Sequence, residues 1–492
     1  MSPWRPPPAL RRAFWVVLAL GFVLRVVFAC ELVSKGAGLE FAKPLDMWLY
    51  PAKARLILDG DYAIATAPEL FAGTTTGVAG FMNTPEGRAR FHRDGGERPL
   101  VDAPGYPYLV AASLGLTGSL TPLRVLQVFV TLLIAYLTFV LARVAGLEGR
   151  VALLAMTFVA LHPTTVFYAG YVLKPTVITL ELLAVCLAFA SYLRRPGSWP
   201  AVALGAALGA LHLTKGIVPL ALPFLGLGLV FTPGTWGAKA KHAGLFLASF
   251  LLVTSPLVVR SLTCGTSPLH NGQSFYLLAV CNYIGADGLH LVQPPVTYVM
   301  DLIEGKESAL GVLGAAVDTH PSFGGFLWLL ARKLQGFFNG YEAWNNLNVY
   351  VDGRMYSSLR SFPLASWILI PCALLGVPAG LRRWRQLGAV WTGLGVVLAS
   401  CLASFVFARY RLPAVPYLAI LAALGIAQLR GSRARLVYGG LTFGLLAFVC
   451  SPFVLELTRT GRGPEIRTRY SEHEVARALA ERYAASPNRE LA

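Results

Sequence analysis

The chain has 492 residues, of which 55% are hydrophobic and only 14% are charged, and its mean hydropathy is +0.58. Soluble domains carry charge on about a quarter of their residues, so this composition excludes a string of soluble domains and predicts a polytopic membrane protein. The net charge of +17 does not indicate a nucleic-acid partner. Most Lys and Arg residues flank apolar runs, where they orient a membrane protein and meet lipid headgroups.

The first apolar run, residues 12–30, follows Arg5, Arg11 and Arg12 and is predicted to be an uncleaved membrane anchor. A polar loop, residues 31–121, comes next and contains a short apolar segment at 106–118. This segment is too short for an ordinary crossing of about 20 residues, so we expect it to dip into the membrane without spanning it. Ten further spans are expected at 122–143, 151–170, 174–193, 199–214, 216–231, 243–262, 362–381, 387–408, 411–429 and 436–455.

Two polar regions interrupt or follow these spans. The second long loop, residues 263–361, contains a segment at 323–338 that is predicted to be an interfacial helix. Cys264 and Cys281 share this loop and could pair in an oxidising compartment. The polar tail, residues 456–492, is predicted to be helical around 472–484.

The charges of the short turns indicate the orientation of the spans. With a cytoplasmic N-terminus and a non-crossing segment 106–118, every short cytoplasmic turn is basic, as the positive-inside rule requires. These turns contain Arg143, Arg150, Arg194, Arg195, Lys239, Lys241, Arg382, Arg383, Arg385, Arg430, Arg433 and Arg435. The predicted fold class is therefore an all-α polytopic membrane protein with about eleven transmembrane helices (residues 1–455), whose two long loops and tail lie on the extracytoplasmic face. The expected location is a bacterial inner membrane.

A carboxylate lies close to the membrane after the first span. Asp46 precedes Tyr50 and Lys53 by four and seven positions, so continuous helix would place the three side chains on one face. Pro51 favours a helix that begins near Tyr50, because proline suits the start of a helix and disrupts its interior. Asp46 would then lie in the turn leading into the helix. In the alternative interpretation Asp46 only caps an interfacial helix.

Five cations are expected at the outer ends of spans, where the positive-inside rule does not predict them. Snorkelling to headgroups would explain any one of them, because it relieves the cost of a charge near hydrocarbon. Together on the leaflet that also holds Asp46, they are better explained by an anionic lipid headgroup. They are Lys174, Lys215, Arg260, Arg409 and Arg411.

This combination fits glycosyl transfer from a lipid phosphate. A carboxylate must take a proton from the acceptor nucleophile, and cations must hold and neutralise the departing phosphate. In this interpretation Asp46 takes the proton from the acceptor, and the outer cations bind and neutralise the phosphate. The sequence does not favour a soluble sugar nucleotide as the donor, because it contains neither a nucleotide-binding loop nor a cytoplasmic domain.

The sequence also resembles the GT-C integral-membrane glycosyltransferases, in particular bacterial relatives of protein O-mannosyltransferases and the aminoarabinose transferases. Leu45-Asp46-Met47 with Ala52-Lys53-Ala54 is similar to the first-loop motif of that family, and Asp102-Ala103-Pro104-Gly105-Tyr106-Pro107 to its loop-ending proline motif. Asn339-Gly340-Tyr341-Glu342 is similar to second-loop sequences of some members, and Arg409-Tyr410-Arg411-Leu412-Pro413 to the late segment. The resemblance implies a GT-C fold, a polyprenyl-phosphate sugar donor and a catalytic acid-base role for Asp46. The substrate-binding candidates are Lys53, Lys174, Lys215, Arg260, Glu342, Arg409 and Arg411.

Several alternatives stay open at this point. No metal ligand is assigned, since Met47 stands where the family usually has a second acid. Asp59-Gly60-Asp61 could bind a divalent cation, but glycine after a helix is also an ordinary C-cap. The sugar, hexosyl or pentosyl, and the acceptor, whether protein, lipid or glycan, are not specified. The competing function is a transporter or flippase for an anionic lipid or glycolipid, although we find no internal repeat of the kind typical of transporters.

Overall fold

The computed structural model describes residues 7–34, 46–62, 64, 103–263, 272–289, 295–306, 308–345, 347–360, 365–429 and 432–460. Within these residues the regular secondary structure is helical, and one isolated β-bridge joins Asn345 to Leu347. The predicted tail helix around 472–484, and Cys264 of the predicted cysteine pair, lie outside the described residues.

The first half of the described chain folds into α1 (Pro8–Ser34), α2 (Asp46–Leu58), α5 (Gly105–Thr117), α6 (Thr121–Val144), α7 (Gly149–Leu161), α8 (Pro163–Gly170), α9 (Pro175–Arg194), α10 (Ser198–Thr214), α11 (Val218–Phe231) and α12 (Trp236–Thr263). The second half folds into α13 (Gly272–Asn282), α14 (Val296–Ile303), α15 (Ala309–Asp318), α16 (Phe323–Phe337), α17 (Val349–Met355), α18 (Ser357–Arg360), α19 (Ala365–Arg382), α20 (Gly388–Ala403), α21 (Ala408–Arg411), η3 (Leu412–Ala414), α22 (Val415–Gln428), α23 (Arg433–Val449) and α24 (Pro452–Thr460).

Apolar helices of membrane-spanning length dominate this arrangement. In the part of the chain that the structure describes, five helices are long and apolar enough to cross a membrane: α1, α6, α9, α12 and the continuous run Ala408–Gln428. The bent pair α7 and α8 makes a sixth if it is taken as one span. The apolar helices α10, α11, α19 and α20 are shorter. The prediction of an all-α polytopic membrane protein is confirmed. The short segment 106–118 forms the 13-residue helix α5, and the predicted interfacial segment 323–338 forms α16.

Two predicted elements differ in detail from the structure. The expected continuous span 151–170 consists of α7 and α8, which are bent by 47° at His162. Pro163 causes this break, because proline lacks an amide proton and disfavours helical geometry in the residue before it. The second difference concerns α2, which begins at Asp46 rather than near Tyr50 and contains Pro51 in its interior. Asp46 therefore lies in the first helical turn.

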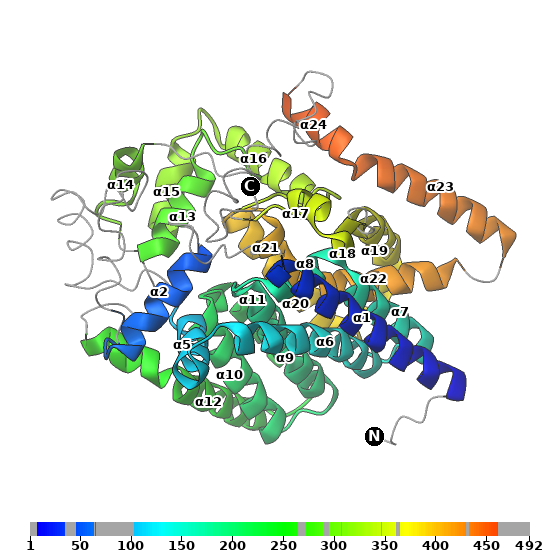
Figure 1. Ribbon diagram of the computed structural model, residues 1–492, viewed down its shortest axis with the longest axis horizontal. Helices are drawn as coiled ribbons and strands as arrows, with labels where there is room; N and C mark the ends of the chain where they lie inside the picture. Colours follow the sequence, from blue (N-terminus) through cyan, green and yellow to red (C-terminus); the bar gives the residue numbers. More distant parts are fainter. Residues whose placement is uncertain are drawn as a thin grey trace.

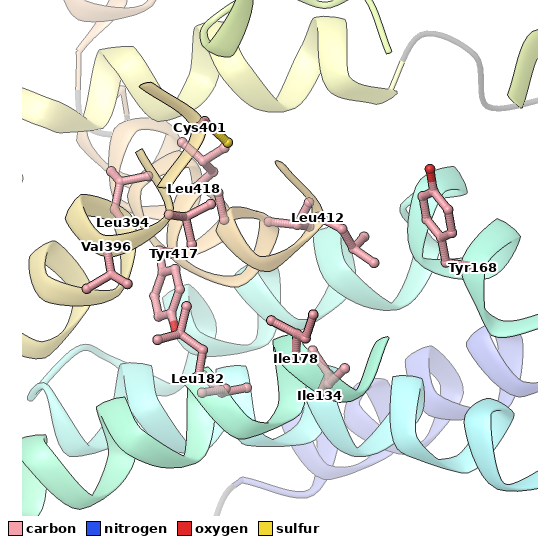
Figure 2. Packing of buried hydrophobic residues seen from close by; sticks show 14 of the residues in the cluster. Ile134, Tyr168, Ile178, Leu182, Leu394, Val396, Cys401, Leu412, Tyr417 and Leu418 are labelled. Atoms are coloured by element: carbon pink, nitrogen blue, oxygen red, sulfur yellow. The ribbon is translucent and has the colours of Figure 1, made fainter. Parts of the chain in front are cut away.

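The helices pack around α9, which contacts α6, α10, α20 and η3, while α22 packs against α7 and α19. Figure 2 shows Tyr417 of α22 pointing toward Leu182 of α9, and its hydroxyl donates to Cys186 Sγ at 3.2 Å. Small residues allow close helix approach: a Cβ at Gly376 of α19 would collide with the backbone carbonyl of Leu421. Figure 1 shows the second-loop helices α13, α14 and α15 gathered at one end of the bundle, where α2 also lies.

A buried arginine joins the first helix to this bundle. The side chain of Arg25 is 1% exposed, and it donates to Thr131 Oγ1 of α6 at 2.7 Å and to the Ala160 carbonyl of α7 at 2.7 Å. It also donates to Thr165 Oγ1 of α8 at 3.1 Å. Ala160 lies in the last turn of α7, where carbonyls lack intrahelical partners. Arg25 therefore uses acceptors that the break at Pro163 leaves available.

We predict that Arg25→Met lowers the free energy of unfolding of the purified protein in detergent by about 2–4 kcal/mol, which is observed as a lower melting temperature. Methionine resembles the apolar part of the arginine side chain in size, but it cannot donate hydrogen bonds. Each buried acceptor that loses its donor costs about 1–3 kcal/mol. Arg25→Lys should give an intermediate loss, because an ammonium cannot reach all of these acceptors. The matched control is the exposed Arg12→Met on the same helix. Equal melting temperatures for Arg25→Met and Arg12→Met would contradict the assigned role.

Candidate functional site

The helix α2 brings a carboxylate to the ends of several apolar helices. Asp46 is its first residue, so its charge interacts favourably with the positive end of the helix dipole. Its side chain, 28% exposed, forms an ion pair with Arg409 of α21, which is 13% exposed. Burial raises the pKa of Asp46, but Arg409 and the charges of Lys174 and Lys53 more than offset this effect. The pKa of Asp46 therefore lies below its ordinary value, and the carboxylate is ionised at neutral pH.

Asp46 opens onto a cavity of about 330 Å³, which we call the Asp46 cavity. Four cations line it together with the one carboxylate, and they come from helices that are distant in the sequence. Lys53 lies on α2, Lys174 immediately precedes α9, Lys215 immediately follows α10, and Arg409 lies on α21. The structure thus brings together five of the eight predicted site residues. It also confirms that Asp46, Tyr50 and Lys53 share one side of α2, since all three line the cavity.

Aromatic rings contact Lys174, Lys215 and Arg409. The ring of Tyr410 lies 4.3 Å from Lys215 Nζ and 4.9 Å from Arg409 Cζ, measured to the ring centroid. Such contacts contribute about 0.5–2 kcal/mol each. Tyr50 lies 5.8 Å from Lys174 Nζ and packs edge-on against Tyr106 of α5. Sequence reasoning did not assign a role to Tyr410; its place between two arginines in Arg409-Tyr410-Arg411 was the available signal.

Much of the remaining lining of the Asp46 cavity is apolar. Leucine, isoleucine and phenylalanine side chains reach it from the start of α9, the start of α11 and the second-loop helix α13. A hydrophobic wall beside a cluster of charges suits an amphipathic ligand, because each part of the ligand meets a matching surface. The apolar residues that line the cavity include Leu173, Ile178, Ile217, Leu220, Phe275 and Leu278.

Glu342 and Arg411, also predicted to bind substrate, lie in a separate buried cluster. Arg411 Nη2 is 2.9 Å from Glu342 Oε2, and the two side chains are 5% and 7% exposed. Arg411 also donates to the backbone carbonyls of Gly336, Phe337, Asn339 and Tyr341, at the end of α16 and in the loop after it. These contacts hold α21 against the second long loop. Neither residue lines the Asp46 cavity, so their contact with substrate stays a prediction.

Polar side chains from two further helices complete this second cluster. Glu342 accepts hydrogen bonds from Thr164 of α8 at 3.3 Å and from Ser366 of α19, and Ser366 contacts His162 at 3.1 Å. Burial raises the pKa of Glu342, but the charges of Arg411 and His162 and the hydrogen bonds outweigh it, so the net pKa is below the ordinary value. Glu342 is therefore ionised and pairs with Arg411.

The remaining candidates lie elsewhere. Arg260, at the end of α12, does not line the Asp46 cavity but interacts electrostatically with Tyr108 of α5. Asp59-Gly60-Asp61 forms the turn after α2, where Gly60 has a φ of +98° and the Asp61 amide donates to the Leu56 carbonyl. This geometry is that of an ordinary helix C-cap with glycine, which was the alternative to a cation-binding role for the segment. Among the described residues, no group of three or more His, Cys, Asp or Glu side chains is arranged to hold a metal ion.

Lys333 is a buried cation that the sequence did not reveal. It lies on the apolar face of α16, at 0% exposure, with Phe326, Leu329 and Phe337. Its ammonium donates to Asn282 Oδ1 at 2.8 Å and to the Leu402 carbonyl at 2.7 Å. Leu402 lies in the last turn of α20, where the helix dipole favours a cation. Burial lowers the pKa of Lys333 to about 8. A lysine inside the apolar stripe of an amphipathic helix was the signal in the sequence.

We predict that Glu342→Gln destabilises the protein by about 3–5 kcal/mol, because it removes one partner of a buried ion pair and leaves Arg411 without its anion. The measurement is the unfolding midpoint of the purified protein in detergent. Glu304→Gln, which neutralises an exposed carboxylate in the same loop, should change the midpoint little. Identical midpoints for the two variants would show that Glu342 does not stabilise α21.

Comparisons with known proteins give only distant likenesses. No family model matches the sequence, and no curated protein matches it. A comparison with solved structures finds weak similarity to three structures of Archaeoglobus fulgidus oligosaccharyltransferase. The first, AglB in complex with an inhibitory peptide and a dolichol-phosphate, has 14% identity and a TM-score of 0.37, and the match covers 78% of this chain and 46% of that one.

The second solved structure is an Archaeoglobus fulgidus oligosaccharyltransferase tethered to an acceptor peptide, with 14% identity and a TM-score of 0.38. That match covers 80% of this chain and 47% of the other. The third is the apo form, with 13% identity, a TM-score of 0.42, and coverage of 96% and 54%. This chain therefore spans about half of the length of these structures. At these identities and TM-scores, the likeness does not assign a function.

Proposed function

We propose that this chain is a membrane glycosyltransferase, which moves a sugar from a polyprenyl-phosphate-linked donor to an acceptor on the extracytoplasmic face of the membrane. The observation that carries this proposal is the Asp46 cavity, which combines one carboxylate with four cations and an apolar wall. A polyprenyl-phosphate sugar has the matching three parts: a reactive anomeric carbon, an anionic phosphate and an apolar chain.

The reaction assigns a separate role to each part of the cavity. The acceptor hydroxyl or amine attacks the anomeric carbon and transfers its proton to the carboxylate of Asp46. The bond between the anomeric carbon and the phosphate oxygen breaks, and the phosphate leaves with the electron pair and one additional negative charge. Lys174, Lys215 and Arg409 line the same cavity as Asp46, and in this mechanism they stabilise that charge. The leucine, isoleucine and phenylalanine wall receives the first units of the prenyl chain.

The ion pair between Arg409 and Asp46 connects donor binding with proton transfer. As long as the guanidinium contacts Asp46, the carboxylate is a weak base because its pKa is held low. A donor phosphate competes for the same guanidinium, since arginine binds phosphate oxygens strongly. Donor binding therefore increases the basicity of Asp46 at the stage when the acceptor proton must be removed.

The direct test uses purified protein with a radiolabelled polyprenyl-phosphate sugar, and it measures transfer of label to acceptor or to water. Cleavage of the bond between sugar and phosphate supports the proposal. Movement of the intact labelled lipid between the leaflets of a vesicle without cleavage would instead support the flippase alternative.

We predict that Asp46→Asn lowers transfer by roughly 10²–10⁴-fold, because the amide cannot accept the proton of the nucleophile. Binding of the donor should not weaken, since the substitution removes a negative charge next to the phosphate. The control is Asp59→Asn at the other end of α2, which should keep its transfer rate. Transfer by Asp46→Asn within a few-fold of the unmodified protein would leave Asp46 as a helix cap and partner of Arg409 only.

We predict that Lys215→Ala weakens donor binding by roughly ten- to a hundredfold, because it removes one charge-assisted contact to phosphate. Lys215→Arg should restore binding only in part, since a planar guanidinium does not replace a compact ammonium. The matched control is Arg383→Ala, which removes an exposed cation outside the cavity. Equal effects of Lys215→Ala and Arg383→Ala would indicate general membrane electrostatics rather than a phosphate site.

A further inference from the structure

A second cavity, of about 210 Å³, lies at the opposite end of the helices that form the Asp46 cavity. The helix α9 begins beside Lys174 at the Asp46 cavity and reaches the second cavity with Phe189 and Tyr192. A rise of 1.5 Å per residue makes this 20-residue helix about 30 Å long, which is the hydrocarbon thickness of a bilayer. The polar ends of the two cavities, at Lys174 and at Tyr192, therefore lie near opposite ends of α9. Their apolar parts come closer together, since Leu220 of α11 lines the Asp46 cavity and Leu222 lines the second cavity.

The walls of the second cavity are almost entirely apolar. The helices α9, α10, α11 and α12 contribute them, and the exceptions are Tyr192 and His242, whose Oη and Nδ1 atoms are 3.2 Å apart. On α11, Leu222, Gly226 and Leu229 follow one another at helical spacing and line the same cavity. An added Cβ at Gly226 would meet no atom within 4 Å, so the space beside it is open. The other apolar lining residues include Phe189, Leu204, Leu225 and Phe246.

The charged side chains near the second cavity that its own lining helices carry are basic. Arg194 and Arg195 end α9, and Lys239 and Lys241 lie in the first turns of α12, just before the lining residue His242. The sequence contains no Asp or Glu between residues 182 and 286. The helix α20 contacts both α9 and α11, and the hairpin that leads into it carries Arg382, Arg383 and Arg385 without an acidic residue. Lys239 donates to the Val230 carbonyl at the end of α11, which keeps its charge at this end of the helices.

Two exposed tryptophans indicate the level of the membrane surface here. Trp199 is 82% exposed at the start of α10, and Trp236 is 74% exposed at the start of α12. Tryptophan is enriched at the headgroup level of a bilayer. The cations are therefore at the level of lipid phosphates, and the apolar cavity extends from that level into the region of the acyl chains.

We propose that the second cavity binds an anionic phospholipid from the membrane. One acyl chain occupies the apolar space between α9, α10, α11 and α12, and the headgroup phosphate is bound by the cations at the ends of α9 and α12. Tyr192 and His242 lie at the polar boundary and provide hydrogen-bonding groups to the lipid esters. This site does not depend on the proposed glycosyl transfer, because the lipid is a resident ligand and not a donor.

The test is native mass spectrometry of the full purified chain with phosphatidylglycerol or with phosphatidylcholine of identical acyl chains. The unmodified protein should retain one more phosphatidylglycerol than phosphatidylcholine. Gly226→Leu and, separately, Ala243→Leu should lose that bound lipid, because each side chain fills the cavity. The matched control is Gly244→Leu, which adds the same side chain next to Ala243 on the exposed side of α12 and should retain the lipid.

The headgroup is tested with the double variant Arg195→Gln and Lys241→Gln. Each cation near an anionic lipid contributes about 1 kcal/mol, which is roughly a fivefold change in affinity, so preference for phosphatidylglycerol should fall at least about fivefold. Arg383→Gln with Arg385→Gln removes the same charge from the neighbouring hairpin and should change the preference less. The proposal is overturned by equal retention of the two lipids, or by full retention in both cavity-filling variants. It is also overturned by equal losses in the two double variants.

Discussion

The ion pair between Asp46 and Arg409 is the interaction on which the arrangement of the site depends. It joins residues 363 positions apart and holds α2, from the first loop, at the ends of the apolar helices. Lys53, Lys174 and Lys215 line the same cavity, and like charges that converge in a low-dielectric surrounding repel one another strongly. The carboxylate of Asp46 and the faces of Tyr50 and Tyr410 reduce that repulsion. The remaining positive charge favours an anionic group in the cavity.

Backbone carbonyls at helix ends take part in stabilising several charges inside the bundle. Arg25 uses the Ala160 carbonyl at the end of α7, and Lys333 uses the Leu402 carbonyl at the end of α20. Arg411 binds four carbonyls at the end of α16 and in the loop after it, in addition to Glu342. Carbonyls in a last helical turn have no intrahelical partner, so a helix that ends or breaks within the bundle supplies acceptors where water is absent. The break at Pro163 and the end of α20 thus supply acceptors to Arg25 and Lys333.

These contacts have a consequence for the site. Arg411 fixes α21 against the second loop, and the Ala408 amide adds a backbone hydrogen bond to the Ala343 carbonyl at 2.8 Å. Arg409 lies between these two anchored residues, and its guanidinium contacts Asp46. The helices α9, α10 and α11 then connect the Asp46 cavity with the basic end of the bundle, so the packing that shapes one cavity also shapes the other.

The sequence by itself determined the class of the protein, the positions of the apolar helices, the short helix α5 and the amphipathic helix α16. It also identified the set of charged residues near the membrane. These features depend on hydropathy, on helical periodicity and on the placement of Lys and Arg, all of which are local properties of the chain. The structural effects of two prolines differ from the sequence-based expectation. Pro51 lies inside a helix that begins at Asp46 rather than near the start of that helix. Pro163 divides residues 151–170, a single span in the sequence-based prediction, into two helices.

Only the tertiary structure decided which of the charged residues meet. Arg409 and Arg411 are equivalent in the sequence, because both follow the same apolar run and belong to the same short motif. Side chains of residues two positions apart on a helix point about 200° away from each other. When one of the two guanidinium groups faces the cavity, the other therefore faces the core. The partners of each, Asp46 at 363 positions and Glu342 across the second loop, are brought to α21 by the packing of helices that are far apart in the chain. No local pattern carries that information, because the pairing depends on which sides of the helices are in contact.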